Sequence, residues 1–135
     1  MNIRTILLVD DDIVDVMTVK RALKDLKSSD KVDVAHNGEE ALEYLQKSHG
    51  DPPGYILLDL NMPRMNGLEF LALIKQDPDL RRIPVVVLTT SMADTDRRAA
   101  FDLGVSGYVV KPVDYSHFVG VMQTIQDYWK ISERG

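Results

Sequence analysis

Residues 6–12 have the sequence ILLVDDD, in which four aliphatic residues run directly into three aspartates. Three further continuous apolar runs are each followed by polar or charged side chains: residues 55–58, 85–88 and 108–110. Continuous runs of this length are typical of strands buried on both faces, as in a parallel sheet covered by helices. A weaker fifth run, residues 32–35, is interrupted by Asp33, which favours an edge strand.

Between these runs, apolar residues recur at the spacing of amphipathic helices. The expected apolar faces are, in chain order, Val16, Val19, Leu23 and Leu26; Ala41, Leu42 and Leu45; Leu68, Leu71 and Ile74; a weaker face of Ala99, Ala100 and Leu103; and Phe118, Val121, Met122, Ile125 and Trp129. Asn37-Gly38 and Asn66-Gly67 stand where helices would begin, and Asp77-Pro78 and Gly104 where they would end. Strand and helix therefore alternate along the chain.

This alternation predicts an α/β fold of the flavodoxin-like, doubly wound class. We expect five parallel strands in the order 2-1-3-4-5, with helices on both faces of the sheet. An α+β fold with antiparallel strand pairing is the alternative. The length of 135 residues is that of one domain.

Composition excludes several classes of protein. The chain has no cysteine, so it has no disulfide framework, no thiolate zinc site and no thiol nucleophile. No apolar stretch approaches the roughly 20 residues that span a bilayer, and Met1 to Thr5 carry no cleavage site, so we expect a soluble, cytoplasmic protein. A net charge of −5 argues against nucleic-acid binding, which needs clustered Lys and Arg.

The side chains that follow the apolar runs are suited to phosphoryl transfer. Asp10 and Asp11 follow one run, and Asp59, Thr89 and Lys111 follow or end the others. Because the carboxyl ends of parallel strands meet at one edge of a sheet, these side chains are expected to converge. Three close carboxylates repel one another, and a divalent cation such as Mg²⁺ relieves that repulsion. Asp59 is then the expected nucleophile, with Asp10 and Asp11 as metal holders, while Lys111 and Thr89 contact phosphoryl oxygens.

Other polar residues have simpler interpretations. Asp12 is expected to cap the helix that follows it, and Asp15 to be a solvated carboxylate in that helix's first turn. His36, His49 and His117 have no spacing typical of a zinc site, and we expect them on the surface or in loops.

The joint spacing of these motifs resembles the receiver domain of two-component response regulators. The matching segments are Leu8-Val9-Asp10-Asp11, residues 57–63 (LLDLNMP) with Gly67, Leu88-Thr89, and residues 108–112 (YVVKP). The resemblance covers about residues 4–129. We therefore expect a single receiver domain over residues 1–135, with a short C-terminal tail at residues 130–135.

In that family an aspartate accepts a phosphoryl group from the phosphohistidine of a histidine kinase. The resemblance implies that Asp59 is this phosphoacceptor. It also implies that Mg²⁺, for which Mn²⁺ can substitute, is bound by Asp11, Asp59 and the backbone carbonyl of Asn61. Asp10 would hold the ion through water.

The resemblance assigns further roles near the other two strand ends. Lys111 matches the lysine that contacts the phosphoryl group, and Thr89 and Tyr108 match the family's switch pair. Pro112 matches a proline that the family usually keeps in the cis form, so a cis peptide bond is expected before it. Phosphorylation would draw Thr89 inward, free space for Tyr108, and change the surface of the fourth helix, fifth strand and fifth helix.

Within the family, the chain resembles the stand-alone regulators paired with bacterial phytochrome-type histidine kinases. The residues that carry this narrower resemblance are Asp10-Asp11-Asp12 with Asp15, residues 77–91, residues 111–114 and the Tyr128-Trp129 ending. Because the chain ends with the fifth helix, we expect no DNA-binding output domain. The output would be a protein contact, such as a homodimer through the fourth helix, fifth strand and fifth helix, or transfer to a histidine phosphotransfer protein.

Two other functions are the alternatives. A phosphatase or phosphotransferase of the haloacid dehalogenase type also uses an aspartate nucleophile and magnesium, but it needs a second aspartate where this chain has Asn61. A binding module of the same fold would not be phosphorylated at all. We expect a signalling switch rather than an enzyme, whose only chemistry is gain and loss of the phosphoryl group at Asp59.

Overall fold

The computed structural model describes residues 4–48 and 50–131. Its centre is a five-stranded sheet in the order β2-β1-β3-β4-β5, and every neighbouring pair is parallel. The strands are β1 (Thr5–Val9), β2 (Lys31–Ala35), β3 (Tyr55–Leu58), β4 (Val85–Thr89) and β5 (Gly107–Val110). The predicted fold class and strand order are confirmed, and the antiparallel alternative is wrong.

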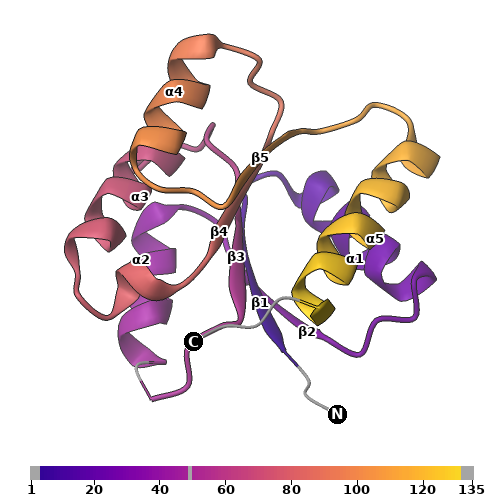
Figure 1. Cartoon of the computed structure of the whole chain (residues 1–135), viewed down its shortest axis with the longest axis horizontal. Coiled ribbons are helices and arrows are strands. Elements are labelled where there is room, and N and C mark those ends of the chain that lie inside the picture. Colours follow the sequence, from indigo (N-terminus) through magenta and orange to yellow (C-terminus); the bar gives the residue numbers. More distant parts are fainter. Residues whose placement is uncertain (1–3, 49, 132–135) are drawn as a thin grey trace.

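Helices cover both faces of the sheet (Figure 1). One face carries α1 (Ile13–Asp25) and α5 (Tyr115–Ile131), and the other carries α2 (Gly38–Lys47), α3 (Gly67–Gln76) and α4 (Asp94–Asp102). A short 3₁₀ helix, η1 (Leu80–Arg82), precedes β4. Two apolar cores result, one on each side of the sheet, because β1, β3 and β4 are buried on both faces.

Side-chain caps fix where three of the helices begin. Asp12 accepts hydrogen bonds from the backbone of α1, Asn37 from that of α2, and Asn66 from that of α3. The cap of α3 is a full capping box, since the Glu69 side chain also accepts from the Asn66 backbone. The predicted starts at all three positions are confirmed.

Helix α4 has the weak apolar face that the sequence predicts, and α5 extends beyond its expected end. Helix α4 buries only Ala100 completely, because its sequence, DTDRRAAFD, leaves few apolar side chains to face the sheet. Helix α5 runs to Ile131, so the first two residues of the expected tail are helical, and residues 132–135 lie outside the described part. Among the described helices, none combines the length and the apolar character needed to cross a bilayer.

A buried polar group, unforeseen from the sequence, lies at the amino-terminal side of the sheet. The Gln126 side chain is 6% exposed and donates to the Tyr55 hydroxyl at 3.0 Å and to Asp30 at 3.2 Å. It also accepts from the Ser28 hydroxyl at 2.8 Å. These contacts tie the second half of α5 to the loop between α1 and β2.

Candidate functional site

The register of the sheet brings Asp10 and Asp59 together. Val9 and Leu58 are direct partners across β1 and β3, and the Asp59 backbone N–H donates to the Val9 carbonyl at 2.9 Å. Asp10 and Asp59 therefore leave adjacent strands side by side at the carboxyl-terminal edge. Both are buried, at 1% and 6% exposure.

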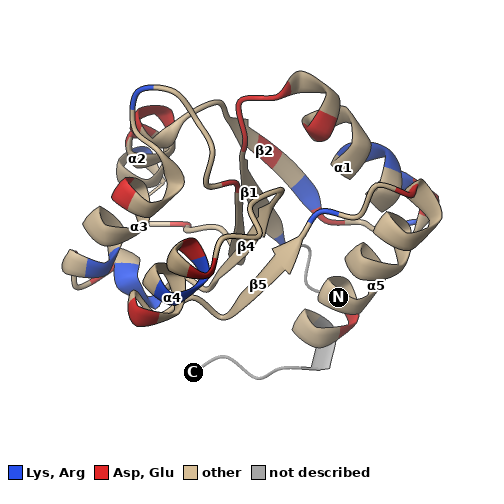
Figure 2. Ribbon diagram, turned by 90° about the horizontal axis from the view of Figure 1, so that it is seen from above, with Lys and Arg blue, Asp and Glu red and all other residues tan. Residues whose placement is uncertain are grey.

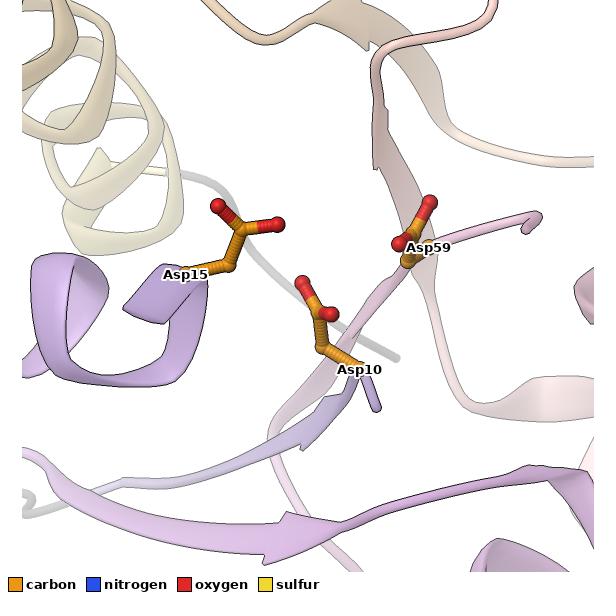
Figure 3. Close-up of side chains that lie close together, drawn as sticks. All are labelled: Asp10, Asp15 and Asp59. Carbon is orange, nitrogen blue, oxygen red and sulfur yellow. The ribbon is translucent and has the colours of Figure 1, made fainter. Parts of the chain in front are cut away.

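A third carboxylate joins them from the first turn of α1. Oxygens of Asp10, Asp15 and Asp59, which we call the acidic cluster, all lie within 4.8 Å of one another. Figure 3 shows Asp10 between Asp15 and Asp59. Acidic residues continue from the end of β1 into α1 (Figure 2). Three carboxylates so close together are the oxygen-only ligand set that a hard divalent cation prefers.

Lys111 crosses from the end of β5 into the acidic cluster. Its backbone N–H donates to the Thr89 carbonyl at 2.8 Å, which extends the pairing of β4 and β5 by one residue. Its Nζ lies 2.6 Å from Asp15 Oδ2, 2.9 Å from Asp10 Oδ2 and 3.5 Å from Asp59 Oδ2. A single ammonium group therefore contacts three carboxylates, and its distance to Asp59 is the longest of the three.

Burial and mutual charge shift the ionisation of this group. Burial raises the pKa of Asp10 to about 6 and the Asp59 charge adds to the rise, although the Asp12 N–H and Lys111 oppose it. Burial alone would lower the pKa of Lys111, but its hydrogen bonds to Asp15 and Asp10 and the charges of Asp10 and Asp59 raise that pKa above its usual value. Lys111 is thus a permanent cation at neutral pH, and the cluster keeps an excess of negative charge.

The loop after β3 is folded back tightly over Asp59. Asp59 Oδ1 accepts the Asn61 backbone N–H at 3.2 Å, and the Gly67 N–H donates to the Leu60 carbonyl at 3.0 Å. A Cβ atom at position 67 would lie 2.7 Å from the Leu60 Cα, so the close approach requires glycine. This geometry keeps the Asn61 backbone next to Asp59.

Thr89 and Tyr108 meet at Ser91. Thr89 is fully buried, and its Oγ1 accepts the Ser91 backbone N–H at 3.3 Å. The Tyr108 hydroxyl donates to the Ser91 carbonyl at 3.0 Å, and its ring lies against Phe101 and Arg97. The two residues of the expected switch pair are therefore linked through one backbone segment.

The structure brings together most of the predicted site, with two exceptions. Asp10, Asp59 and Lys111 converge, and Thr89 ends the neighbouring strand. Asp11 is exposed and is not among the three clustered carboxylates.

The second exception is Pro112. The expected cis bond before it is wrong, since the described residues contain no cis peptide bond. A trans amide is the lower-energy form at most X-Pro bonds.

Asp15 is the residue that sequence reasoning placed wrongly. The sequence predicts a solvated side chain at this position, yet Asp15 makes the shortest contact to Lys111. One feature of the sequence could have indicated this contact: only the cap residue Asp12 separates the strand-end aspartates from α1, so the first helical turn lies next to the strand end.

Two simpler predictions hold. Asp12 is a cap as predicted, and His36 pairs with Glu40 on the surface. His49 lies outside the described residues.

Comparison with known proteins gives the family. The model of the response regulator receiver domain matches residues 6–123. The chain is 38% identical over 130 residues to the response regulator Rcp1 of Synechocystis sp., covering 93% of this chain and 88% of Rcp1. It is also 38% identical over 127 residues to the probable methanogenesis regulatory protein FilR2 of Methanothrix harundinacea, covering 92% of this chain and 82% of FilR2.

Solved structures agree with these matches. The phosphorylated cyanobacterial phytochrome response regulator RcpA superposes with a TM-score of 0.90 at 35% identity, covering 98% of this chain and 97% of RcpA. The Mn²⁺-bound form of Rcp1 superposes with a TM-score of 0.88 at 36% identity, covering 98% of this chain and 99% of Rcp1. The family expected from the motifs is confirmed: the chain belongs to the receiver-domain family of two-component response regulators.

Proposed function

We propose that Asp59 accepts a phosphoryl group from the phosphohistidine of a histidine kinase. The observation that carries this proposal is a buried strand-end carboxylate whose neighbour, Lys111 Nζ, is 3.5 Å away. An Asp59 oxygen forms the new O–P bond as the P–N bond breaks, and the bonding electron pair stays on the imidazole nitrogen. Lys111 supplies a fixed positive charge for the phosphoryl oxygens.

The donor chemistry of the site fits a divalent cation, and we propose Mg²⁺, with Mn²⁺ as a substitute. Asp11, Asp59 and the backbone carbonyl of Asn61 would hold it directly, and Asp10 through water. When bound, the ion neutralises carboxylate charge and favours approach of the phosphoryl group. Three clustered carboxylates against one lysine support a divalent cation at this edge of the sheet, as does the Mn²⁺-bound form of the relative Rcp1. Asp11 lies outside that cluster and enters the ligand set only through the family resemblance.

The phosphoryl group would switch the protein by competing for the Thr89 hydroxyl. Thr89 Oγ1 accepts from the Ser91 N–H, so a Thr89 side chain turned toward the phosphoryl group changes its contact with Ser91. Tyr108 is bound to the carbonyl of that same residue, and the Ser91 hydroxyl donates to Asp96 of α4 at 2.6 Å. The change would therefore reach the surface formed by α4, β5 and α5.

The relatives support a kinase of the phytochrome type as the phosphoryl donor. RcpA is described as a phytochrome response regulator and is similar to this chain over nearly its whole length. Apolar side chains exposed beside the site are typical of surfaces that contact other proteins; they are Ile13, Val14, Met17 and Val113.

We further propose a cytoplasmic, single receiver domain over residues 1–135, with its core at about residues 4–129, that acts as a switch and not as an enzyme. Its output would be a homodimer or transfer to a histidine phosphotransfer protein.

Phosphorylation by a small donor tests this proposal. The protein is incubated with Mg²⁺ and acetyl phosphate, and its intact mass is measured with time. Wild type should gain one phosphoryl group, and Asp59→Asn should gain none. No gain by wild type, or equal gain by Asp59→Asn, would overturn the proposal. Sustained turnover of a phosphate ester would instead favour the phosphatase alternative.

The kinase assignment needs its own experiment. A phosphorylated phytochrome-type kinase and a phosphorylated chemotaxis-type kinase are offered to the protein at equal concentrations. Faster transfer from the phytochrome-type kinase is expected. Equal rates from both would contradict that partner while leaving Asp59 as the phosphoacceptor.

A further inference from the structure

We propose that Asp15 is a positioning residue that holds the Lys111 ammonium group away from Asp59 in the unphosphorylated protein. The inference rests on the proposed function, because it concerns the same site. Asp15 would thereby set how readily Asp59 keeps a phosphoryl group, without touching that group itself.

The distances show where the ammonium group rests. Lys111 Nζ is 2.6 Å from Asp15 and 2.9 Å from Asp10, but 3.5 Å from Asp59, at the limit of a hydrogen bond. Charge-assisted hydrogen bonds in the range of the first two distances are the strong ones. The Lys111 side chain is 9% exposed, so water does not compete freely for it. Its preferred partners are therefore Asp15 and Asp10.

The start of α1 fixes Asp15 in this place. Asp12 Oδ1 accepts the Val14 N–H at 2.8 Å and the Asp15 N–H at 3.4 Å. The Asp12 backbone N–H in turn donates to Asp10 Oδ1 at 2.9 Å. The Asp15 backbone is thus tied through the cap to the strand-end aspartate, and its carboxylate is aimed at the end of the Lys111 side chain.

Phosphorylation changes the competition for this one cation. A phosphoryl group on Asp59 adds a charge of about −1.5 to −2 near the Lys111 ammonium group. In the unphosphorylated protein that ammonium group is held by Asp15 and Asp10. When Lys111 moves to the phosphoryl oxygens, it leaves Asp15. A contact made only in the unphosphorylated state favours that state, so its removal should shift the population toward the phosphorylated protein.

Loss of charge repulsion is another explanation for the expected effect of removing the Asp15 carboxylate. Asp15 is negative, and its loss could favour any anion at the site without involving Lys111. Asp12→Asn separates the two accounts, because it removes a carboxylate from the same end of α1, and asparagine caps a helix as well as aspartate does. Asp12 makes no contact with Lys111 among the ion pairs of the described residues.

The experiment measures the acetyl phosphate concentration that gives half-maximal phosphorylation of Asp59, by intact mass at saturating Mg²⁺. In each turnover an Asp59 oxygen bonds to phosphorus and acetate leaves with the electron pair of the broken O–P bond. Asp15→Asn should lower this concentration by about two- to fivefold, a range set by one partly exposed ion pair. Asp12→Asn should change it by less than about twofold, and Asp15→Glu should return it toward wild type.

A second readout follows Lys111 directly. In ¹⁵N NMR, ammonium protons held by Asp15 and Asp10 should give a slowly exchanging lysine signal in wild type and in Asp12→Asn. Asp15→Asn should speed its exchange, with melting curves showing that each variant is folded.

The outcomes are distinct. Equal half-maximal concentrations for Asp15→Asn and Asp12→Asn, or an unchanged lysine signal in Asp15→Asn, would overturn the role of Asp15. If wild type takes up no phosphoryl group, the proposed function itself fails, and the lysine signal alone then decides whether Asp15 holds Lys111.

Discussion

The same residue type has three different environments within the acidic cluster. The Asp10 side chain is 2% exposed, that of Asp59 is 8% exposed and that of Asp15 is 33% exposed. Asp10 also accepts the Asp12 backbone N–H, so it is the most enclosed of the three. This enclosure is the main reason why the pKa of the Asp10 carboxyl is raised.

Removing one carboxylate should stabilise the metal-free protein. Asp59→Asn removes a buried charge that lies within 4.8 Å of two like charges, and it leaves Lys111 its two shorter contacts. We expect the free energy of unfolding to rise by about 1 kcal/mol, measured by urea denaturation in the presence of a chelator. Asp127→Asn, an exposed position on α5, is the control and should change it little. A less stable Asp59→Asn protein would contradict mutual repulsion within the acidic cluster.

Asp10 should make the metal-free protein less stable as pH rises. Its pKa is about 6 in the folded protein and 3.8 when unperturbed, so the folded state binds the proton more tightly. The stabilisation from protonated Asp10 is therefore complete below pH 3.8 and is lost as pH rises through 6. Lys111 stays charged throughout this window.

Urea denaturation at several pH values between 4 and 7 tests this dependence. Wild type should lose about 2 kcal/mol more of its unfolding free energy across the window than Asp10→Asn. The comparison uses the slope with pH, since the variant also changes the contacts of Lys111. Parallel slopes for the two proteins would show that Asp10 ionises normally.

The sequence predicted the cluster residues that lie at strand ends. Asp10, Asp59 and Lys111 follow continuous apolar runs, and parallel strands bring such positions to one edge. Asp15 could not be predicted in the same way, because a first-turn helical acid is ordinarily solvated and favoured by the helix dipole alone. Its role depends on how far the Lys111 side chain reaches, which no spacing rule encodes.

The β3–α3 connection shows how an element boundary serves the site. Asn66 caps α3, and Gly67 lets the first turn of the helix approach the backbone of residues 59 and 60. The loop between them is thereby held against Asp59, with the Asn61 N–H on its carboxylate. The capping signal could be predicted from Asn66-Gly67, but the close backbone approach could not.

Two glycine-to-alanine changes should act in opposite directions. Gly67→Ala places a Cβ 2.7 Å from the Leu60 Cα, where backbone must shift, and should lower the unfolding free energy by about 1–3 kcal/mol. Gly120→Ala, in α5, meets no atom within 4 Å and should raise it by about 0.5–1 kcal/mol. Thermal and urea unfolding check both. A rise in both would mean that helix propensity, and not the close contact, governs position 67, whereas a fall in both would contradict the expectation for position 120.

The helices were predicted to different degrees for a physical reason. Leu71 and Ile74 of the predicted face of α3 are buried, but the prediction omitted Phe70, which is also buried. Helix α4 buries only Ala100 completely, as its weak apolar pattern predicts. Gln126 was missed because a polar residue in an apolar stripe gives no sign of its partners. Tyr55, Ser28 and Asp30 come from distant parts of the chain.

Metal binding should stabilise the whole molecule. A ligand that binds only the folded protein adds RT ln(1 + [L]/Kd), about 2.7 kcal/mol at a hundredfold excess over Kd. Mg²⁺ should therefore raise the melting temperature of wild type, and Asp59→Asn should lose most of that rise. Calorimetric scans at increasing Mg²⁺ check this. An equal rise in the variant would place the ion elsewhere.

The hydrogen bonds of Gln126 hold the second half of α5 in place. The second half of the helix is bound to Tyr55 and to the α1–β2 loop, while its first turn follows the loop that carries Lys111. The first turn is held as well, because the Tyr115 hydroxyl donates to Asp25 of α1 at 2.6 Å and Phe118 is buried against the sheet. Because both ends of α5 are held, a rearrangement at the carboxyl-terminal edge is expected to change the position of α4 relative to α5, and not to slide α5 along the sheet.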